Sequence, residues 1–138
     1  MRVFLDANVL FSAAYRDSGS VRVFFGLARA GMCTLASSGF AAGEARRNIA
    51  AKHPKRLPDL ESLIGELALC SEPSQETLEW AAQRLPVKDA PILAAAVDAR
   101  CQLLVTGDRT HFGPLFGTRQ RGTVVLTPVD AIELLVGR

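Results

Sequence analysis

Short apolar runs alternate with longer amphipathic segments along the whole chain, and this alternation predicts strands interleaved with helices. Each run holds a few consecutive apolar residues and ends at a polar residue or a glycine, which is typical of a strand that a sheet buries on both faces. The strands predicted in this way are 3–5, 33–36, 103–106 and 123–126, with a brief strand at 69–70.

The segments between these runs place apolar residues at helical spacing and are bounded by residues that begin or end helices. Ser37 and Ser38 are candidate caps for a helix that Pro54 ends, and Thr127 with Pro128 has the cap and the first-turn proline of a terminal helix. The predicted helices are 7–15, 20–30, 39–53, 58–67, 75–85, 89–101 and the segment from 128 onward.

Strands that alternate with helices imply right-handed crossovers and a sheet covered on both faces. We therefore predict an α/β fold, a three-layer sandwich with a central, mostly parallel sheet. The chain has 138 residues, close to the common size of one domain, and contains no repeat or long polar linker, so we expect a single domain over residues 1–138. In such sheets, functional groups gather at the carboxyl ends of the strands.

Composition narrows the class of protein. A hydrophobic fraction of 49% with 22% charged residues is typical of a folded globular chain. No apolar run approaches the roughly 20 residues that cross a bilayer, and Asp6 interrupts any signal-peptide core, so we expect a cytoplasmic protein without a membrane anchor. Cys33, Cys70 and Cys101 are odd in number and far apart, which favours buried free thiols over a zinc site or disulfides.

The net charge of +2 is too small to attract nucleic acid through overall charge, but its distribution is uneven. Residues 46–56 contain five basic residues and no acidic one, and this segment is either a solvated helix face or a surface that contacts phosphates. Its basic residues are Arg46, Arg47, Lys52, Lys55 and Arg56.

Four of the acidic residues stand where a surface charge is not expected. Asp6 ends the first predicted strand, and Asp108 follows another strand after a glycine. Asp89 opens the most apolar helix, and Glu44 lies about a turn and a half into its own helix. Each position alone has an ordinary explanation as a cap, a turn residue or a helix surface. Together, all four are expected at the carboxyl edge of the sheet.

Carboxylates that share one pocket repel one another, and burial strengthens the repulsion unless a cation neutralises it. Oxygen ligands without a cysteine cluster select hard divalent ions, and we expect Mg²⁺ or Mn²⁺. Such an ion can supply an ionised water that attacks a phosphodiester, and a second ion, if present about 4 Å away, would stabilise the leaving oxygen.

The order of these motifs resembles PIN-domain ribonucleases, and their toxin-like branch in particular. The similarity covers nearly the whole chain and follows the family's order. The motifs that carry it are Asp6-Ala7-Asn8-Val9-Leu10, Glu44 before Arg46-Arg47, Lys88-Asp89-Ala90-Pro91-Ile92-Leu93-Ala94-Ala95-Ala96, Leu104-Val105-Thr106-Gly107-Asp108 and Arg109-Thr110-His111-Phe112-Gly113.

The resemblance implies a metal-dependent endoribonuclease that leaves a 5′-phosphate and a 3′-hydroxyl. It implies that Asp6, Glu44, Asp89 and Asp108 hold Mg²⁺ or Mn²⁺. Asn8 and Thr106 would support the site through hydrogen bonds. Many members of this branch are toxins of VapBC-type pairs, often homodimeric and inhibited by a small antitoxin. The apolar positions of helices 20–30 and 58–67 are a further reason to expect a homodimer.

One departure from the family pattern concerns the metal site. Many relatives carry another aspartate two positions after the last one, whereas this chain has Thr110. A complete second metal site is therefore in doubt. His111 is a candidate either to replace that acid or to contact a phosphate, and Arg109 is a second candidate for RNA binding.

Other functions fit the sequence less well. A haloacid-dehalogenase phosphatase needs an acid two residues after Asp6, where this chain has Asn8. A response-regulator receiver needs paired acids after its first strand and a lysine that ends a late strand, and Lys88 instead precedes a helix. Two alternatives stay open: a PIN-like module that binds RNA or protein without cleavage, and a housekeeping RNA-processing nuclease.

Overall fold

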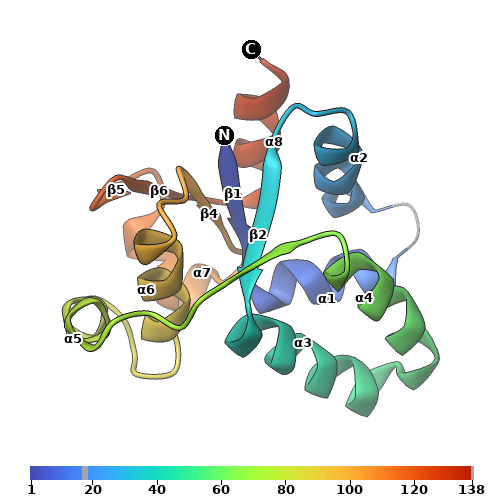
Figure 1. Ribbon diagram of the computed structural model, residues 1–138, viewed down its shortest axis with the longest axis horizontal. Coiled ribbons are helices and arrows are strands. Elements are labelled where there is room, and N and C mark those ends of the chain that lie inside the picture. The colour runs from blue at the N-terminus through green and yellow to red at the C-terminus, as the bar shows by residue number, and fades with distance from the viewer. Residues whose placement is uncertain (17–18, 138) are drawn as a thin grey trace.

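The computed structural model describes residues 1–16 and 19–137 (Figure 1). Its strands form one six-stranded sheet in the order β3-β2-β1-β4-β6-β5, in which every pair is parallel except β5 with β6. This is the predicted α/β class with a mostly parallel sheet. The strands are β1 (Arg2–Leu5), β2 (Thr34–Ser38), β3 (Ala68–Cys70), β4 (Leu103–Val105), β5 (Arg119–Gln120) and β6 (Thr123–Leu126).

Helices cover both faces of this sheet, as the three-layer prediction requires. Figure 1 shows α1, α2 and α4 on one side of the central strands and α5 and α6 on the other, while α8 packs on β4 and β6. Short 3₁₀ turns occur at 20–22, 54–56 and 113–115. The α-helices are α1 (Ala7–Tyr15), α2 (Val23–Arg29), α3 (Gly39–Lys52), α4 (Leu57–Ile64), α5 (Gln75–Ala82), α6 (Ala90–Asp98), α7 (Arg109–Phe112) and α8 (Pro128–Val136).

Side-chain caps begin the helices that follow strands. Asp6 accepts a hydrogen bond from the Ala7 amide and so begins α1 directly after β1. Ser38 caps α3 through the Ala41 amide, and Thr127 caps α8. A cap at the last residue of a strand forces the helix to start at the carboxyl edge of the sheet. This local rule brings the amino ends of α1 and α3 to the same edge.

Two parts of the secondary structure differ from the prediction. β2 continues through Ser37 and Ser38, because both residues pair with the edge strand β3. The Ser37 hydroxyl donates a 2.8 Å hydrogen bond to the Leu5 carbonyl, so of the two candidate caps only Ser38 caps α3. The segment after Asp108 forms the short helix α7 and then the hairpin β5–β6. Arg121 and Gly122 turn that hairpin with φ of 48° and 91°, the two positive values of a type I′ turn.

Most of the large apolar residues of the predicted dimer helices are covered within the chain itself. Phe24 and Phe25 of α2 and Leu60 and Leu63 of α4 are all buried in the described structure, whereas Val23 of α2 is 40% exposed. The buried positions have partners inside one chain and do not support a homodimer, so dimerisation stays a prediction. Among the described residues, no helix combines the length and apolar character needed to cross a membrane.

The cysteines are free thiols, as predicted. Cys33 and Cys101 are buried, whereas Cys70 on the edge strand β3 is only partly covered. Burial raises the pKa of the Cys101 thiol to about 12, so this thiol stays protonated at neutral pH and behaves as a small apolar group.

The centre of the sheet should dominate the stability of the fold. Leu104 of β4 is fully buried between β1 and β6. Replacing Leu104 with alanine removes buried apolar volume and should lower the free energy of unfolding by about 2–5 kcal/mol. Urea denaturation measures this loss. Val87→Ala, at a side chain that is 83% exposed, is the control and should change little. Equal losses at both positions would contradict the described core.

Candidate metal centre

The pairing of β1 with β4 places two polar residues side by side at the carboxyl edge. Leu5 is opposite Val105, and the Asp6 amide donates to the Val105 carbonyl at 3.0 Å. The Thr106 amide in turn donates to Leu126 of β6 at 3.1 Å. Asp6 and Thr106, the residues that directly follow β1 and β4, are therefore each held by a backbone hydrogen bond to the neighbouring strand.

Hydrogen bonds from three neighbours fix the Asp6 carboxylate. Its Oδ1 accepts from the Ala7 amide at 2.6 Å, and its Oδ2 accepts from the Thr106 hydroxyl at 2.8 Å and from Asn8 Nδ2 at 3.2 Å. Asn8 also accepts from the Gly107 amide at 2.8 Å. Asn8 and Thr106 thus contact the carboxylate that the sequence predicts they support, and they connect the end of β1 to the end of β4.

Burial makes the charge of Asp6 unfavourable in the absence of a cation. The residue is 5% exposed, and this desolvation raises its pKa from 3.8 to about 6. The hydrogen bonds from Thr106 and Ala7 oppose the shift, whereas repulsion from Glu44 and Asp89 adds to it. The repulsion also indicates that Glu44 of α3 and Asp89 before α6 face the same edge as Asp6.

The tightest group of ligand-type atoms at this edge comprises Asp89, Asp108 and His111, whose candidate ligand atoms all lie within 4.8 Å of one another. His111 Nδ1 is 3.0 Å from Asp108 Oδ2 and 3.1 Å from Asp89 Oδ2. His111 Nδ1 donates a hydrogen bond to Asp108 Oδ2 when the ring carries its proton on Nδ1. Asp89 Oδ2 thus lies close to the His111 ring. This buried oxygen nevertheless has no hydrogen-bond partner among the described residues.

The two aspartates of this group differ in their surroundings. Burial raises the pKa of Asp89, although the nearby His111 opposes the shift. Burial also acts on Asp108, but hydrogen bonds from the backbone and ring of His111 outweigh it and lower the pKa of that carboxyl. Asp108 is thus ionised more readily than Asp89, and both carboxylates are only partly exposed.

The four predicted acids are therefore arranged in two parts. Asp89 and Asp108 lie in the tight group, while Asp6 and Glu44 lie outside it, and the charges of Glu44 and Asp89 both act on Asp6. His111, which the sequence offered as an alternative to the missing acid, lies on α7 with its ring directed at the aspartates. Thr110, in the place of that acid, is exposed.

The predicted RNA-binding cations have different partners. Arg46 forms a two-point ion pair with Glu61 of α4, at 2.7 and 3.0 Å, and is thereby held against a neighbouring helix. The Lys52 ammonium lies 5.5 Å from the centre of the Phe11 ring. Arg47 and Arg109 are exposed. Of these cations, Arg109 is next in sequence to the aspartate group, directly after Asp108.

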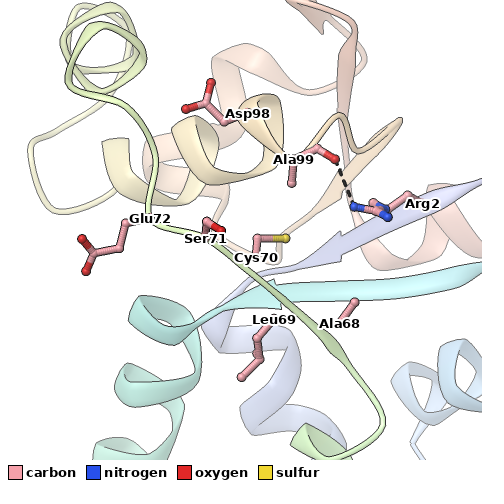
Figure 2. A pocket seen from close by; sticks show the side chains of 8 residues that line it. All are labelled: Arg2, Ala68, Leu69, Cys70, Ser71, Glu72, Asp98 and Ala99. Atoms are coloured by element: carbon pink, nitrogen blue, oxygen red, sulfur yellow. Dashed lines mark hydrogen bonds between the residues drawn. The ribbon is translucent and has the colours of Figure 1, made fainter.

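Two cavities help to locate the site. One, of about 420 Å³, adjoins the aspartate group through Asp108 and is lined by Asn8, Val9, Ser12, Val21, Gly107, Asp108 and Pro128. The other, of about 310 Å³, lies beside β3 and the end of α6 (Figure 2). Its Arg2 binds the Ala99 carbonyl, and its Asp98 accepts from the Ser74 amide and the Thr77 hydroxyl. Those charges already have protein partners, so we place the candidate site at the first cavity.

Comparison with known proteins identifies the family of the chain. The profile of the PIN domain matches residues 2–110, which is most of the chain. The chain belongs to the PIN domain family. PIN domains are generally nucleases that use divalent metal ions. No curated protein sequence matches this chain closely enough to count as a relative.

Three solved structures share the fold. VapBC2 from Rickettsia felis, bound to a DNA fragment from its promoter, is 16% identical with a TM-score of 0.68 over 92% of this chain and 98% of that one. PAE2754 from Pyrobaculum aerophilum is 16% identical with a TM-score of 0.66 over 100% and 97%. VapBC-1 from nontypeable Haemophilus influenzae is 13% identical with a TM-score of 0.61 over 94% and 99%. These TM-scores establish a common fold.

The residues at this edge fit a divalent ion chemically. Carboxylate oxygens are the preferred ligands of Mg²⁺ and Mn²⁺, and the ring nitrogen of His111 is a further donor for Mn²⁺. The buried Asp89 Oδ2, which has no hydrogen-bond partner among the described residues, gains one strong interaction if a cation binds there. The structure thus contains a candidate metal centre formed by Asp89, Asp108 and His111.

The raised pKa of Asp6 predicts how stability depends on pH without metal. Because its pKa is about 6 in the folded chain and 3.8 as a free group, the unfavourable charge is present at pH 7 and disappears as the pH falls toward 4. With EDTA, the unfolding free energy of wild type should therefore rise relative to Asp6→Asn, by about 2 kcal/mol over this range.

Urea denaturation between pH 4 and 7 measures this difference. Glu79→Gln removes an exposed carboxylate on α5 and should follow the wild-type profile. If the difference in unfolding free energy between wild type and Asp6→Asn stays constant across this pH range, burial does not raise the pKa of Asp6 and the prediction is wrong.

Proposed function

We propose that this chain is a metal-dependent endoribonuclease that hydrolyses RNA phosphodiesters at the carboxyl edge of its sheet. The observation that carries the proposal is the convergence of Asp89, Asp108 and His111 beside the buried Asp6, in a chain of the PIN domain family. Mg²⁺ or Mn²⁺ is the proposed cofactor. When bound, such an ion lowers the pKa of a coordinated water and polarises the phosphoryl oxygen.

The residues of the chain would then have separate tasks. Asp89 and Asp108 hold the ion, and Asp6 and Glu44 add negative charge that draws the cation to the edge. Asn8 and Thr106 orient the Asp6 carboxylate through the hydrogen bonds described above. Hydrolysis adds water across the bond between phosphorus and the 3′-oxygen, which leaves a 5′-phosphate and a 3′-hydroxyl.

We further propose that the nuclease is the toxin of a type II toxin–antitoxin pair. The similar structures from Rickettsia felis and Haemophilus influenzae are both VapBC proteins, and this chain covers nearly all of each matched chain. The partner would be a small antitoxin, and the compartment the cytoplasm. A small protein encoded beside this gene that copurifies with the chain and inhibits its cleavage of RNA supports this proposal.

The alternative of a PIN-like module that binds without cutting has less support. A module that only binds has no need of a buried, repulsive carboxylate such as Asp6 or of an aspartate oxygen left without a hydrogen bond. A housekeeping RNA-processing nuclease would use the same site, so inhibition by an antitoxin separates it from a toxin.

Cleavage should depend on Asp89. Asp89→Asn keeps the shape of the side chain, and its Oδ2 has no hydrogen-bond partner to lose among the described residues, so the fold should survive. An amide binds a hard cation poorly, and the cleavage rate should fall on the order of a hundredfold or more. The assay follows single-stranded and hairpin RNAs with Mg²⁺ or Mn²⁺ and checks for 5′-phosphate ends.

Glu79→Gln is the matched control for removal of a carboxylate and should cleave as wild type does. Equal rates for wild type and Asp89→Asn would mean that a contaminating nuclease, or another site, performs the reaction. Binding of RNA without any metal-dependent cleavage would instead favour the module that does not cut.

Arg109 should contribute to RNA binding rather than to the chemical step. This exposed cation lies next in sequence to Asp108, so a substrate phosphate near the ion is within its range. Arg109→Ala should weaken RNA binding and reduce the slope of its dependence on salt by about one. Arg46→Ala should have a smaller effect, because Arg46 is already paired with Glu61. Fluorescence anisotropy measures the RNA affinity and the salt dependence of both variants, each made in the Asp89→Asn background. An unchanged salt slope in Arg109→Ala would exclude a contact between Arg109 and a phosphate.

A further inference from the structure

We infer that His111 is itself a ligand of the metal ion and gives the site a preference for Mn²⁺ over Mg²⁺. This inference rests on the proposed function, because it assigns the composition of the same metal centre. It moves His111 from the candidate RNA-binding residues to the group that holds the ion.

The start of α7 fixes the position of His111 relative to the aspartates. Asp108 caps this helix, and its Oδ1 accepts a 3.0 Å hydrogen bond from the His111 amide. Residues at i and i+3 lie on the same side of a helical turn, so the imidazole and the Asp108 carboxylate face the same direction. The ring is 31% exposed and lies against the aspartate side chains, which are 23% and 16% exposed.

If His111 only donated a hydrogen bond, one of the two neighbouring carboxylates would be left without a partner. Nδ1 lies 3.0 Å from Asp108 and 3.1 Å from Asp89, yet one N–H serves one acceptor well, and Asp89 Oδ2 has no hydrogen-bond partner among the described residues. With the proton on Nε2 instead, Nδ1 presents a lone pair to the same space. Two carboxylate oxygens and one nitrogen lone pair then face the same space, where one cation could bind to all three.

The spacing is close to what one ion needs. The three ligand atoms lie within 4.8 Å of one another. Two ligands of a single ion with bonds of about 2.1 Å can be at most about 4.2 Å apart, so small rotations of the side chains suffice. The half-buried position of each group limits competing solvent and keeps the side chains in place.

The nitrogen ligand determines which ion is preferred. Carboxylates alone suit Mg²⁺ and Mn²⁺ about equally, whereas imidazole binds transition-metal ions better than it binds Mg²⁺. A site with Asp89, Asp108 and His111 should therefore bind Mn²⁺ more tightly than Mg²⁺. Replacing the imidazole with a carboxylate should shift that preference toward Mg²⁺.

Isothermal titration calorimetry with Mn²⁺ and with Mg²⁺, at one fixed pH, tests the assignment without RNA. His111→Ala should weaken Mn²⁺ binding tenfold or more while changing Mg²⁺ binding much less. His111→Asp should narrow the ratio between the two affinities. His53→Ala is the matched control, because His53 follows α3 and stacks on Tyr15 at 4.1 Å, and it should bind both ions as wild type does.

A spectroscopic measurement on the unmodified chain is independent of whether a variant folds. Pulsed electron paramagnetic resonance of the Mn²⁺ complex should show a directly coordinated nitrogen in wild type and in His53→Ala, and none in His111→Asp. Absence of the nitrogen signal in wild type, or equal Mn²⁺ affinity in wild type and His111→Ala, overturns the inference. Weaker RNA binding by His111→Ala at unchanged metal affinity would make His111 a phosphate contact instead.

Failure of this inference can be distinguished from failure of the proposed function. If wild type binds Mn²⁺ and cleaves RNA but lacks the nitrogen signal, the nuclease stands and His111 is not a ligand. If wild type binds neither ion at millimolar concentration, both the inference and the metal-dependent mechanism are wrong.

Discussion

The parallel pairing of β1 with β4 is the constraint on which the site depends. It places Asp6 beside Thr106, and the hydrogen bonds among Asp6, Asn8 and Thr106 then join the ends of the two strands. Gly107 and Asp108 follow at once, with the Asp108 amide donating to the Thr106 hydroxyl at 3.1 Å. The position of Asp108 is thus set by two buried central strands of the sheet.

This arrangement has an electrostatic consequence for the chain without metal. Burial and neighbouring carboxylates raise the pKa values of Asp6 and Asp89, so the fold keeps groups together that would be more stable apart. Structures retain such unfavourable charges where a ligand offsets them. Within the described residues, His111 offsets part of the repulsion, and a divalent cation would offset more of it while leaving the protein contacts in place.

Much of this arrangement is predictable from the sequence because it follows from local rules. Apolar runs that end at Asp6 and shortly before Asp108 predict buried parallel strands, and parallel strands bring their carboxyl ends to one edge. The ends of α1 and α8 follow from caps and prolines that the sequence displays directly. The family resemblance, which the PIN domain profile bears out over residues 2–110, rests on the same motifs.

The remaining features depend on contacts between distant residues. Ser37 looks like a helix cap, yet its hydroxyl binds Leu5 on the neighbouring strand. Arg46 looks like a free cation, yet Glu61 of another helix holds it. The position of His111 beside Asp108 has a local signal, because Asp108 and His111 have the spacing of a helix cap and the third residue of its helix. A helix as short as α7 lacks the periodicity that would have revealed it.

The central claim is that a divalent ion binds between Asp89, Asp108 and His111, and crystals of the wild-type chain soaked in Mn²⁺ test it most directly. Anomalous diffraction locates manganese independently of any assumption about ligands or activity. The account predicts a single strong peak within bonding distance of both aspartates, and a much weaker one in crystals of Asp89→Asn. Manganese bound only elsewhere on the surface, with this edge of the sheet left without a peak, would contradict it.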